Sequence, residues 1–357
     1  MTASYTWVQW NRHKIRYDLA LGAGSLVFLG VFIGAGTALY SGEHALDPMI
    51  LMMRAFATLA VILLHIILCI GPLARLSTLF SPLLYNRRHL GVSMFLAALA
   101  HAGLAFLYYG AFGVRFPVTA LVDGYHAYSS ISGFPFEMLG LGALLLLFVM
   151  ASTSHDFWLA FLGHRTWKSL HMLVYFAYGL VLLHVSLGIL QSETNIVYPV
   201  LLVGGLAIVS GLHLVAGLRE RRVDAGATAP ADGWVDVGPV SEFKLNRGRV
   251  VCLKDAERIA VFRHDNGLSA MANVCAHQGG PLGEGAIVGG CVTCPWHGYQ
   301  YVPENGQSPP PYTEKVPTYE LRVEGDRVLL NPSPKAPGTP IEPAPVPSTA
   351  ASENQHG

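Results

Sequence analysis

The stretch Cys275-Ala276-His277, followed after sixteen residues by Cys294-Pro295-Trp296-His297, decides the fold of the C-terminal part of this 357-residue chain. It brings two thiolates and two imidazoles into two short segments, C-x-H and C-x-x-H. A [2Fe-2S] cluster can be held by this set, because two Cys bind one iron while two His replace Cys on the other and raise the potential. Glycines at 279, 280 and 298 let the backbone turn tightly beside the segments. The sequence therefore predicts a [2Fe-2S] cluster held by Cys275, His277, Cys294 and His297.

A structural zinc site is the alternative interpretation of this region. Cys291, Cys294 and His297 offer a second spacing of the C-x-x-C type, which zinc sites use. Zinc gives no reason for the flanking glycines or for Pro295, whereas a cluster held between two tight loops does. The iron–sulfur interpretation is therefore favoured.

Short alternating runs surround the motif, at residues 234–237, 250–253, 258–262 and 319–323. They are typical of strands, and the sequences at 265–267 and 324–326 are typical of turns. We therefore expect a small antiparallel β domain over residues 233–332. This region resembles a ferredoxin-type Rieske [2Fe-2S] domain, and the family pattern is matched at all four predicted ligand positions.

The N-terminal two thirds of the chain is apolar. Hydrophobic residues make up 52% of the whole chain and charged residues only 13%, which is typical of a membrane protein. Runs of roughly 17–25 apolar residues can cross about 30 Å of hydrocarbon, and six such runs in succession without a polar face argue against core helices of a soluble protein. The predicted spans are 19–40, 55–73, 90–112, 135–154, 169–190 and 196–218.

The basic residues predict an orientation for these spans. Lys and Arg lie in the N-terminal tail, in the second and fourth connections and after the sixth span, whereas the other connections carry only Arg115 and, directly before the second span, Arg54. The positive-inside rule then predicts a multi-pass protein of the cytoplasmic (inner) membrane with both termini in the cytoplasm. The five Cys, which have no disulfide-type spacing, agree with a reducing compartment around the β domain.

Histidines stand out within the spans, where polar side chains are costly and indicate function. His101 in the third span and His184 in the fifth reach a similar depth, so they could bind a haem between facing helices. His171 lies thirteen residues before His184, about 20 Å away along the helix axis and near the cytoplasmic face. At that depth its nearest match is His89, and His65 of the second span is another candidate.

A second resemblance rests on three segments, Gly71-Pro72-Leu73-Ala74-Arg75-Leu76, Arg87-Arg88-His89-Leu90-Gly91 and Trp167-Lys168-Ser169-Leu170-His171. Together with His101 and His184 they resemble the ferric-reductase-like transmembrane domain, over about residues 51–217. That family includes the haem-bearing membrane subunit of a bacterial methionine sulfoxide reductase system. The resemblance implies b-type haem at His101, His171 and His184. Two-haem relatives carry a further His at the position of Arg87, so this chain is expected to hold one haem, or two if His89 replaces that ligand.

The fold class expected is a membrane all-α six-helix bundle followed by a small C-terminal all-β Rieske domain. The predicted parts are a cytoplasmic N-terminal tail (1–18), the haem-binding transmembrane domain (19–218), a linker of small residues (219–232), the Rieske domain (233–332) and a disordered Pro/Ala-rich tail (333–357).

These parts predict a membrane-bound protein that relays electrons between a cytosolic [2Fe-2S] cluster and transmembrane b-type haem. We expect a cytosolic ferredoxin or reductase as one partner and a membrane or extracytoplasmic electron acceptor or donor as the other. No flavin or nicotinamide motif is found, and no segment fits the mononuclear iron domain of a complete Rieske oxygenase. Zero net charge gives no reason to expect nucleic acid. The alternatives are a membrane-tethered redox or iron sensor and a terminal ferric or quinone reductase.

The surroundings of the motif also bear on the redox potential. High-potential Rieske proteins have a disulfide between the two loops and a Ser after the last His, where this sequence has Ala276, Trp296 and Tyr299. Fewer hydrogen bonds to the sulfurs should lower the potential toward the bottom of the range of about −150 to +300 mV.

Overall fold

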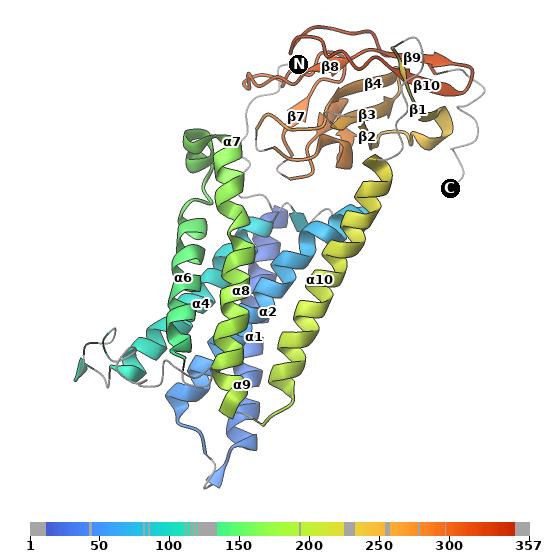
Figure 1. Cartoon of the computed structure of the whole chain (residues 1–357). Helices are drawn as coiled ribbons and strands as arrows, with labels where there is room; N and C mark the ends of the chain where they lie inside the picture. The colour runs from blue at the N-terminus through green and yellow to red at the C-terminus, as the bar shows by residue number, and fades with distance from the viewer. Residues whose placement is uncertain are drawn as a thin grey trace. The chain divides into compact units, whose positions relative to one another are not determined.

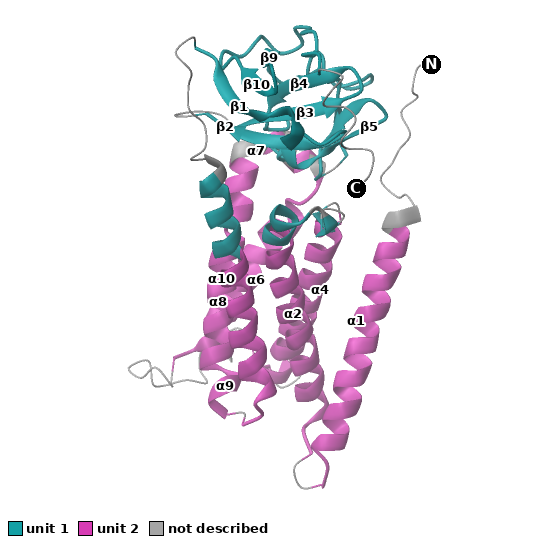
Figure 2. Ribbon diagram, turned by 90° about the vertical axis from the view of Figure 1, so that its right-hand side faces the viewer, with its two compact units in different colours: residues 1–7, 72–85, 213–357 teal, residues 8–71, 86–212 magenta. Residues whose placement is uncertain are grey.

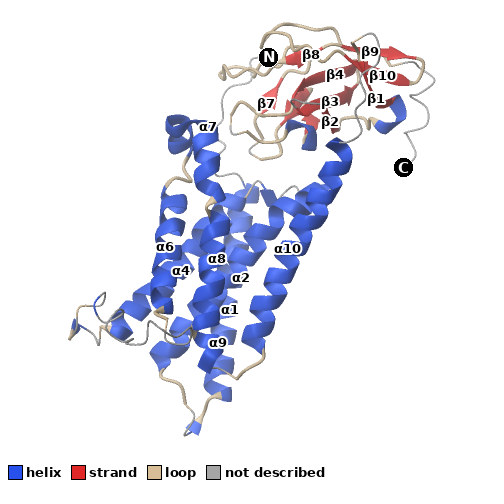
Figure 3. Cartoon of the chain, viewed as in Figure 1, coloured by secondary structure: helices blue, strands red, loops and turns tan. Residues whose placement is uncertain are grey.

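The computed structural model describes residues 12–42, 45–80, 83–84, 86–110, 113–114, 116, 119, 134–192, 194–224, 233–253, 258–277, 279–296 and 298–346. The chain divides into two compact units, which are coloured separately in Figure 2. One unit comprises Met1–Trp7, Pro72–Tyr85 and His213–Gly357, and the other comprises Val8–Gly71 and Asn86–Leu212. Figure 3 shows the long helices before residue 225 and the strands in the C-terminal domain.

In the described part of the chain, five helical segments are long and apolar enough to cross a membrane: Ile15–Leu39, Pro48–Leu76, Arg87–Tyr109, Thr166–Ser192 and Val197–Arg222. They belong to α1 (Arg12–Leu39), α2 (Pro48–Leu76), α4 (Arg87–Tyr109), the run from α7 (Asp156–Met172) through α8 (Val174–Leu187) to α9 (Ile189–Ser192), and α10 (Val197–Asp224), as labelled in Figure 1. The predicted fourth span corresponds to α6 (Phe136–Ser152), an apolar helix of 17 residues. The largely helical membrane part is confirmed, whereas the count of six spanning helices is not.

The apolar faces of these helices divide between the bundle interior and its outer surface. Leu63, Leu64 and Ile67 of α2 are buried in the helical unit. In contrast, Leu26, Val27 and Val31 of α1 are each at least 65% exposed. A helix that is apolar on every side and exposed on one of them suits a lipid environment.

The predicted fifth span, 169–190, lies just after a kink and includes the junction between two helices. Leu173 separates α7 from α8, and Gly163 inside α7 has φ 72°, a left-handed conformation that kinks this helix. Glycine tolerates that conformation because it has no Cβ. The continuous membrane-length segment therefore starts at Thr166, after the kink, and contains both His171 and His184.

The C-terminal domain consists of three small antiparallel sheets. Their strand orders are β1-β10-β9, β2-β3-β4-β8 and β5-β6-β7. The first sheet contains β1 (Val235–Pro239), β9 (Leu321–Glu324) and β10 (Arg327–Leu330). The second contains β2 (Gly248–Cys252), β3 (Arg258–His264), β4 (Gly267–Ala272) and β8 (Thr318–Tyr319), and the third contains β5 (Ala286–Val288), β6 (Cys291–Thr293) and β7 (Gln300–Tyr301). The all-β prediction for this region is confirmed.

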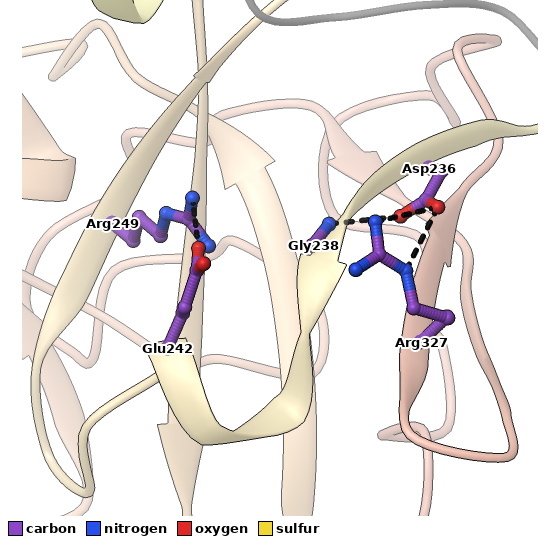
Figure 4. Close-up of polar contacts among 5 residues, drawn as sticks. All are labelled: Asp236, Gly238, Glu242, Arg249 and Arg327. Carbon is purple, nitrogen blue, oxygen red and sulfur yellow. Dashed lines mark hydrogen bonds and ion pairs between the residues drawn. The ribbon is translucent and has the colours of Figure 1, made fainter.

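The core of this domain lies around the central strands β3 and β4. Ile259, Val261, Phe262, Leu268 and Met271 are fully buried and belong to one cluster of apolar side chains. Figure 4 shows two ion pairs of this domain. Asp236 of β1 pairs with Arg327 of β10 at 2.7 Å within the first sheet, and Glu242, in the turn after β1, pairs with Arg249 of β2. The β domain thus has its own core and supports the loops between β4 and β7.

Residues 333–346 do not form the disordered tail that the sequence predicts. Ala344 is 4% exposed, and its amide and carbonyl both hydrogen-bond to Leu268 of β4 at 2.8 and 2.9 Å. Lys335 makes a further backbone bond to Thr318. Proline has no amide donor, and the many prolines of this segment led to the prediction of disorder. Their carbonyls and apolar rings remain available for contacts with the β domain. Residues 347–357 lie outside the described part of the chain.

Candidate metal centres

The first predicted ligand segment forms a tight turn after β4. The amide of Cys275 donates to the carbonyl of Gly280 (2.9 Å), and the amide of Gly279 donates to the carbonyl of Cys275 (2.7 Å). Gly279 has φ 70°, which this turn needs and which glycine adopts without strain. The turn keeps the Cys275 side chain inside the domain, where it is 1% exposed.

The second ligand segment, between β6 and β7, repeats the same turn. The amide of Cys294 donates to the carbonyl of Tyr299 (2.8 Å), and the amide of Gly298 donates to the carbonyl of Cys294 (2.9 Å). Gly298 has φ 69°, and Cys294 is 2% exposed. Two equivalent turns therefore present one buried thiol each.

The two loops lie in direct contact. A Cβ built at Gly280 would lie 2.7 Å from Cys294 Sγ, so only glycine lets the first loop come this close to the second thiol. The ring of His277 stacks on Tyr299, with centroids 4.7 Å apart and planes 8° apart. His297 lies outside the described residues. Gly280 and the His277–Tyr299 stack thus show that the two loops are in contact. Among the described residues, no group of three or more His, Cys, Asp or Glu side chains is arranged to hold a metal ion, so the role of Cys275, His277 and Cys294 as ligands stays a prediction.

Buried thiols in two glycine-rich turns fit a [2Fe-2S] cluster better than zinc. None of the five cysteines, all of which the structure describes, is in a disulfide. Cys291 of β6, which the zinc interpretation requires, pairs with Val288 in the sheet and is only half-buried. The donor set therefore favours iron and sulfide at Cys275, His277 and Cys294.

Tyr301 is a residue of this centre that the sequence analysis missed. Its hydroxyl lies 3.2 Å from Cys275 Sγ and accepts a hydrogen bond from the amide of Ala276 (2.9 Å). Burial and the neighbouring Cys275 raise the pKa of Tyr301, so the hydroxyl stays protonated and can donate to the sulfur. The sequence predicts few hydrogen bonds to the cluster sulfurs, but Cys275 Sγ has one donor in Tyr301, which raises the potential expected for the cluster. Tyr301 follows His297 by four residues in the sequence. The pairing of β7 with β6 places it next to the first loop.

The membrane histidines form a second candidate centre. The imidazole rings of His101 on α4 and His184 on α8 lie with centroids 6.2 Å apart. His101 Nδ1 is 3.0 Å from the carbonyl of Met53, and His184 Nδ1 is 2.9 Å from the carbonyl of Phe136. A carbonyl can only accept, so each Nδ1 carries the proton and each Nε2 has a lone pair for a metal.

A cavity of about 550 Å³ contains both of these rings. Its wall is mainly apolar and includes residues of α2, α4, α6, α8 and α10, among them Ala105, Leu141, Leu144 and Leu202. Gly140 of α6 makes room for His184, since a Cβ there would lie 2.8 Å from the ring. The pocket is of the size that proteins use for cofactors, about 300–1,000 Å³.

These observations fit an iron porphyrin. The two ring centroids lie 6.2 Å apart beside the cavity, and neither Nε2 carries a proton, which is the state in which both imidazoles could bind one iron. The pairing of His101 with His184, predicted from their depth in the spans, is the arrangement found here. The role of both as haem ligands stays a prediction.

The other predicted ligands have different surroundings. His171 Nδ1 is 3.0 Å from the carbonyl of Trp167, and the two rings stack with centroids 3.9 Å apart. His89 Nδ1 forms an ion pair with Asp18 of α1 at 2.6 Å. His65 lies edge-on to the ring of Tyr178 at 5.4 Å. A second haem at His171 with His89 or His65 therefore stays a prediction.

Comparison with known proteins identifies both parts of the chain. The Rieske [2Fe-2S] domain family matches residues 233–320, and the family described as ferric reductase like transmembrane component matches residues 56–182. The chain joins a ferric-reductase-like transmembrane domain to a Rieske [2Fe-2S] domain. Each match covers one of the two regions for which the sequence predicts that family, so both predicted resemblances are confirmed.

Relatives resemble one domain or the other. The anthranilate 1,2-dioxygenase ferredoxin subunit of Burkholderia cepacia is 35% identical over 28% of this chain and 91% of that protein. The protein-methionine-sulfoxide reductase heme-binding subunit MsrQ of Polaromonas naphthalenivorans is 28% identical over 49% of this chain and 74% of that protein. Cholesterol 7-desaturase nvd 1 of Ciona intestinalis is 33% identical over 29% of this chain, which spans only 23% of the desaturase.

The apolar helices and the ferric-reductase-like domain together show a multi-pass membrane protein. The Rieske domain adds an iron–sulfur centre, so the two domains support a role in membrane electron transfer.

Proposed function

We propose that this protein relays single electrons between a Rieske [2Fe-2S] cluster and b-type haem bound in its transmembrane domain. The observation that carries the proposal is the His101–His184 pair, two imidazoles facing one cavity with both Nδ1 atoms tied to carbonyls. The Rieske loops of the same chain provide the second redox centre. The similarity to a haem-binding subunit, which extends over 49% of this chain, supports the same assignment.

In this proposal the chain's own residues hold and orient both groups. Cys275 and Cys294 bind one iron of the cluster, and His277 and His297 bind the other. Tyr301 donates to Cys275 Sγ, which stabilises the reduced cluster.

In the cavity, His101 and His184 would hold the haem iron through their Nε2 atoms. The carbonyls of Met53 and Phe136 fix the tautomer and the ring planes. The mainly apolar wall would limit the access of water to a bound haem. When bound, haem supplies reversible one-electron chemistry.

We further propose the topology that the basic residues predict. The short helix α6 serves as the sixth span, because 17 residues rise about 25 Å, close to the lower limit for crossing a bilayer. Both termini then lie in the cytoplasm, and the protein belongs to the cytoplasmic membrane. The proposed boundaries are 19–218 for the membrane domain and 233–332, extended to 346, for the Rieske domain.

The proposed partners follow from that topology. A cytosolic ferredoxin or reductase exchanges electrons with the cluster, and an acceptor or donor in the membrane or outside it exchanges electrons with the haem. The Rieske domain's similarity to a ferredoxin subunit supports a protein redox partner for the cluster.

Two variants test whether the cluster and the haem bind independently, and a reduction experiment on the wild type tests whether electrons pass between them. His277→Ala should abolish the EPR signal of the reduced cluster and keep the haem absorbance, while His184→Ala should do the reverse. In the wild type, rapid photoreduction of the cluster under anaerobic conditions should be followed by reduction of the haem in the same molecule.

Loss of both signals in either single variant would contradict two separable centres. A cluster that is reduced while the haem stays oxidised would contradict the relay and favour the sensor alternative. The ratio of haem to protein in the wild type and in His171→Ala counts the haems: an unchanged ratio in the variant would exclude a second haem at His171.

A further inference from the structure

Glu137 is an acidic residue buried inside the helical unit. It lies in the first turn of α6 and is only 8% exposed. The hydroxyl of Tyr109 on α4 donates to its Oε1 at 3.2 Å. Its second oxygen, Oε2, is buried and has no hydrogen-bond partner among the residues that the structure describes. A carboxyl group in this state is costly to keep charged unless a positive charge lies nearby, and the cavity that Glu137 lines offers Arg54 and, with ferric haem bound, the charge of the iron.

The position of Glu137 connects it to the proposed haem site. It lines the same cavity as His101 and His184, and it directly follows Phe136, whose carbonyl accepts the Nδ1 proton of His184. Among the described residues that line this cavity, Glu137 is the sole carboxyl group. The titratable or charged side chains facing the cavity are Arg54 of α2, His101, Tyr108 and Tyr109 of α4, Glu137 of α6, His184 of α8 and Tyr198 of α10.

An electron that enters this cavity changes the charge balance around Glu137. In a low-dielectric interior the added negative charge makes a nearby carboxylate bind a proton more tightly. Neither histidine can take that proton, because each Nδ1 already carries one and each Nε2 faces the metal in the proposed site. Tyr108, Tyr109 and Tyr198 are protonated in their ordinary state and have no site for a second proton. Arg54 is protonated in its ordinary state as well. Among the protein side chains that line the cavity, Glu137 is therefore the group that can respond.

We infer that Glu137 takes up one proton when the haem between His101 and His184 is reduced and releases it when the haem is oxidised. The electron converts ferric to ferrous iron, and a proton from the aqueous phase converts the carboxylate of Glu137 to the carboxylic acid. The net charge of the cavity therefore stays the same when the haem is reduced and when it is oxidised again. Electron transfer through this domain is then coupled to proton movement. This inference rests on the proposed haem site.

The test is a redox titration of the haem in the detergent-purified full-length protein, followed by visible absorbance at a series of pH values. The wild-type midpoint should fall as the pH rises, with a slope that approaches one proton per electron. Glu137→Gln, which keeps an acceptor for Tyr109 but cannot exchange a proton, should lose that slope. The matched control is Asp47→Asn, the same change at an exposed carboxylate that precedes α2, and it should keep the wild-type slope.

The outcomes separate the inference from the proposed function. A wild-type midpoint that does not change with pH, or a Glu137→Gln variant that retains the full slope, overturns the proton coupling and leaves the haem relay intact. A purified protein without any haem spectrum after haem supplementation overturns the relay and the coupling together.

A second variant keeps the inference testable if Glu137→Gln fails to fold. Tyr109→Phe removes a hydrogen bond that favours the charged carboxylate. It should therefore keep the pH dependence but move it to higher pH. An unshifted pH profile in this variant would contradict the role of Glu137.

Discussion

Replacing Gly140 with alanine should remove haem from the His101–His184 cavity while the [2Fe-2S] cluster stays in place. Gly140 lies on α6, and a Cβ at this position would approach Cε1 and Nδ1 of His184 to 2.8 Å. Ordinary contacts of a Cβ begin at 3.4 Å, so the imidazole would have to move by about 0.6 Å, beyond the roughly 0.5 Å that ligand geometry tolerates. The movement also disturbs the bond from His184 Nδ1 to the carbonyl of Phe136.

The expected magnitude follows from the cost of overpacking. Adding a methyl group to a packed site costs about 1–3 kcal/mol. Because 1.4 kcal/mol corresponds to about a tenfold change in affinity, haem should bind roughly 5- to 150-fold more weakly. Gly142→Ala is the matched control, because its Cβ on the same helix would meet only Leu180 Cδ1, at an ordinary 3.5 Å.

The assay is the haem content per protein at limiting haem supply, from the dithionite-reduced minus air-oxidised spectrum. The EPR signal of the reduced cluster in the same samples shows that the Rieske domain is folded. Gly140→Ala should lose haem and keep the cluster signal, while Gly142→Ala should retain both. Equal haem content in the two variants would refute the assignment of His184 as a ligand held in place by α6.

Three further predictions concern the Rieske domain. Tyr301→Phe should lower the midpoint of the cluster, measured by EPR-monitored titration, by about 43 mV for each 1 kcal/mol of hydrogen bonding lost at Cys275 Sγ; an unchanged midpoint would contradict the bond. Gly280→Ala should abolish cluster binding but not haem absorbance, because its Cβ would lie 2.7 Å from Cys294 Sγ. Burial lowers the pKa of His264 below its ordinary value. The unfolded chain therefore binds the proton first, and the stability that is complete above about pH 6.5 should fall as the pH decreases. His264→Gln should remove that decrease in thermal unfolding followed by the circular dichroism of the cluster, and an identical pH dependence in both proteins would count against it.

Local sequence patterns were sufficient for the features that depend on residue type and spacing. The C-x-H and C-x-x-H segments with their glycines predicted two tight loops, and the structure has two equivalent turns at Cys275 and Cys294. The apolar runs predicted the long helices. In lipid an unpaired backbone N–H or C=O group is costly, and a single segment can pair all of these groups internally only as a helix. The similar depth of His101 and His184 predicted their pairing, because each helix rises by a fixed amount per residue.

Other features depended on packing between segments that are distant in the chain. Residues 333–346 looked disordered because proline and alanine form no periodic pattern, yet Ala344 pairs with Leu268 across 76 positions. Tyr301 reaches Cys275 only through the register of β6 and β7. Glu137 looked like an ordinary polar residue at the start of a helix, and only the approach of α4 placed it against Tyr109 in the cavity.

The sequence by itself determined the ligand types, the lengths of the helices and the two domain families. The tertiary structure decided which tyrosine donates to a sulfur and which carboxyl group shares a cavity with His101 and His184. The physical reason is that ligand chemistry and helical rise are properties of short segments, whereas contacts across 48 or 26 positions depend on how helices and sheets pack.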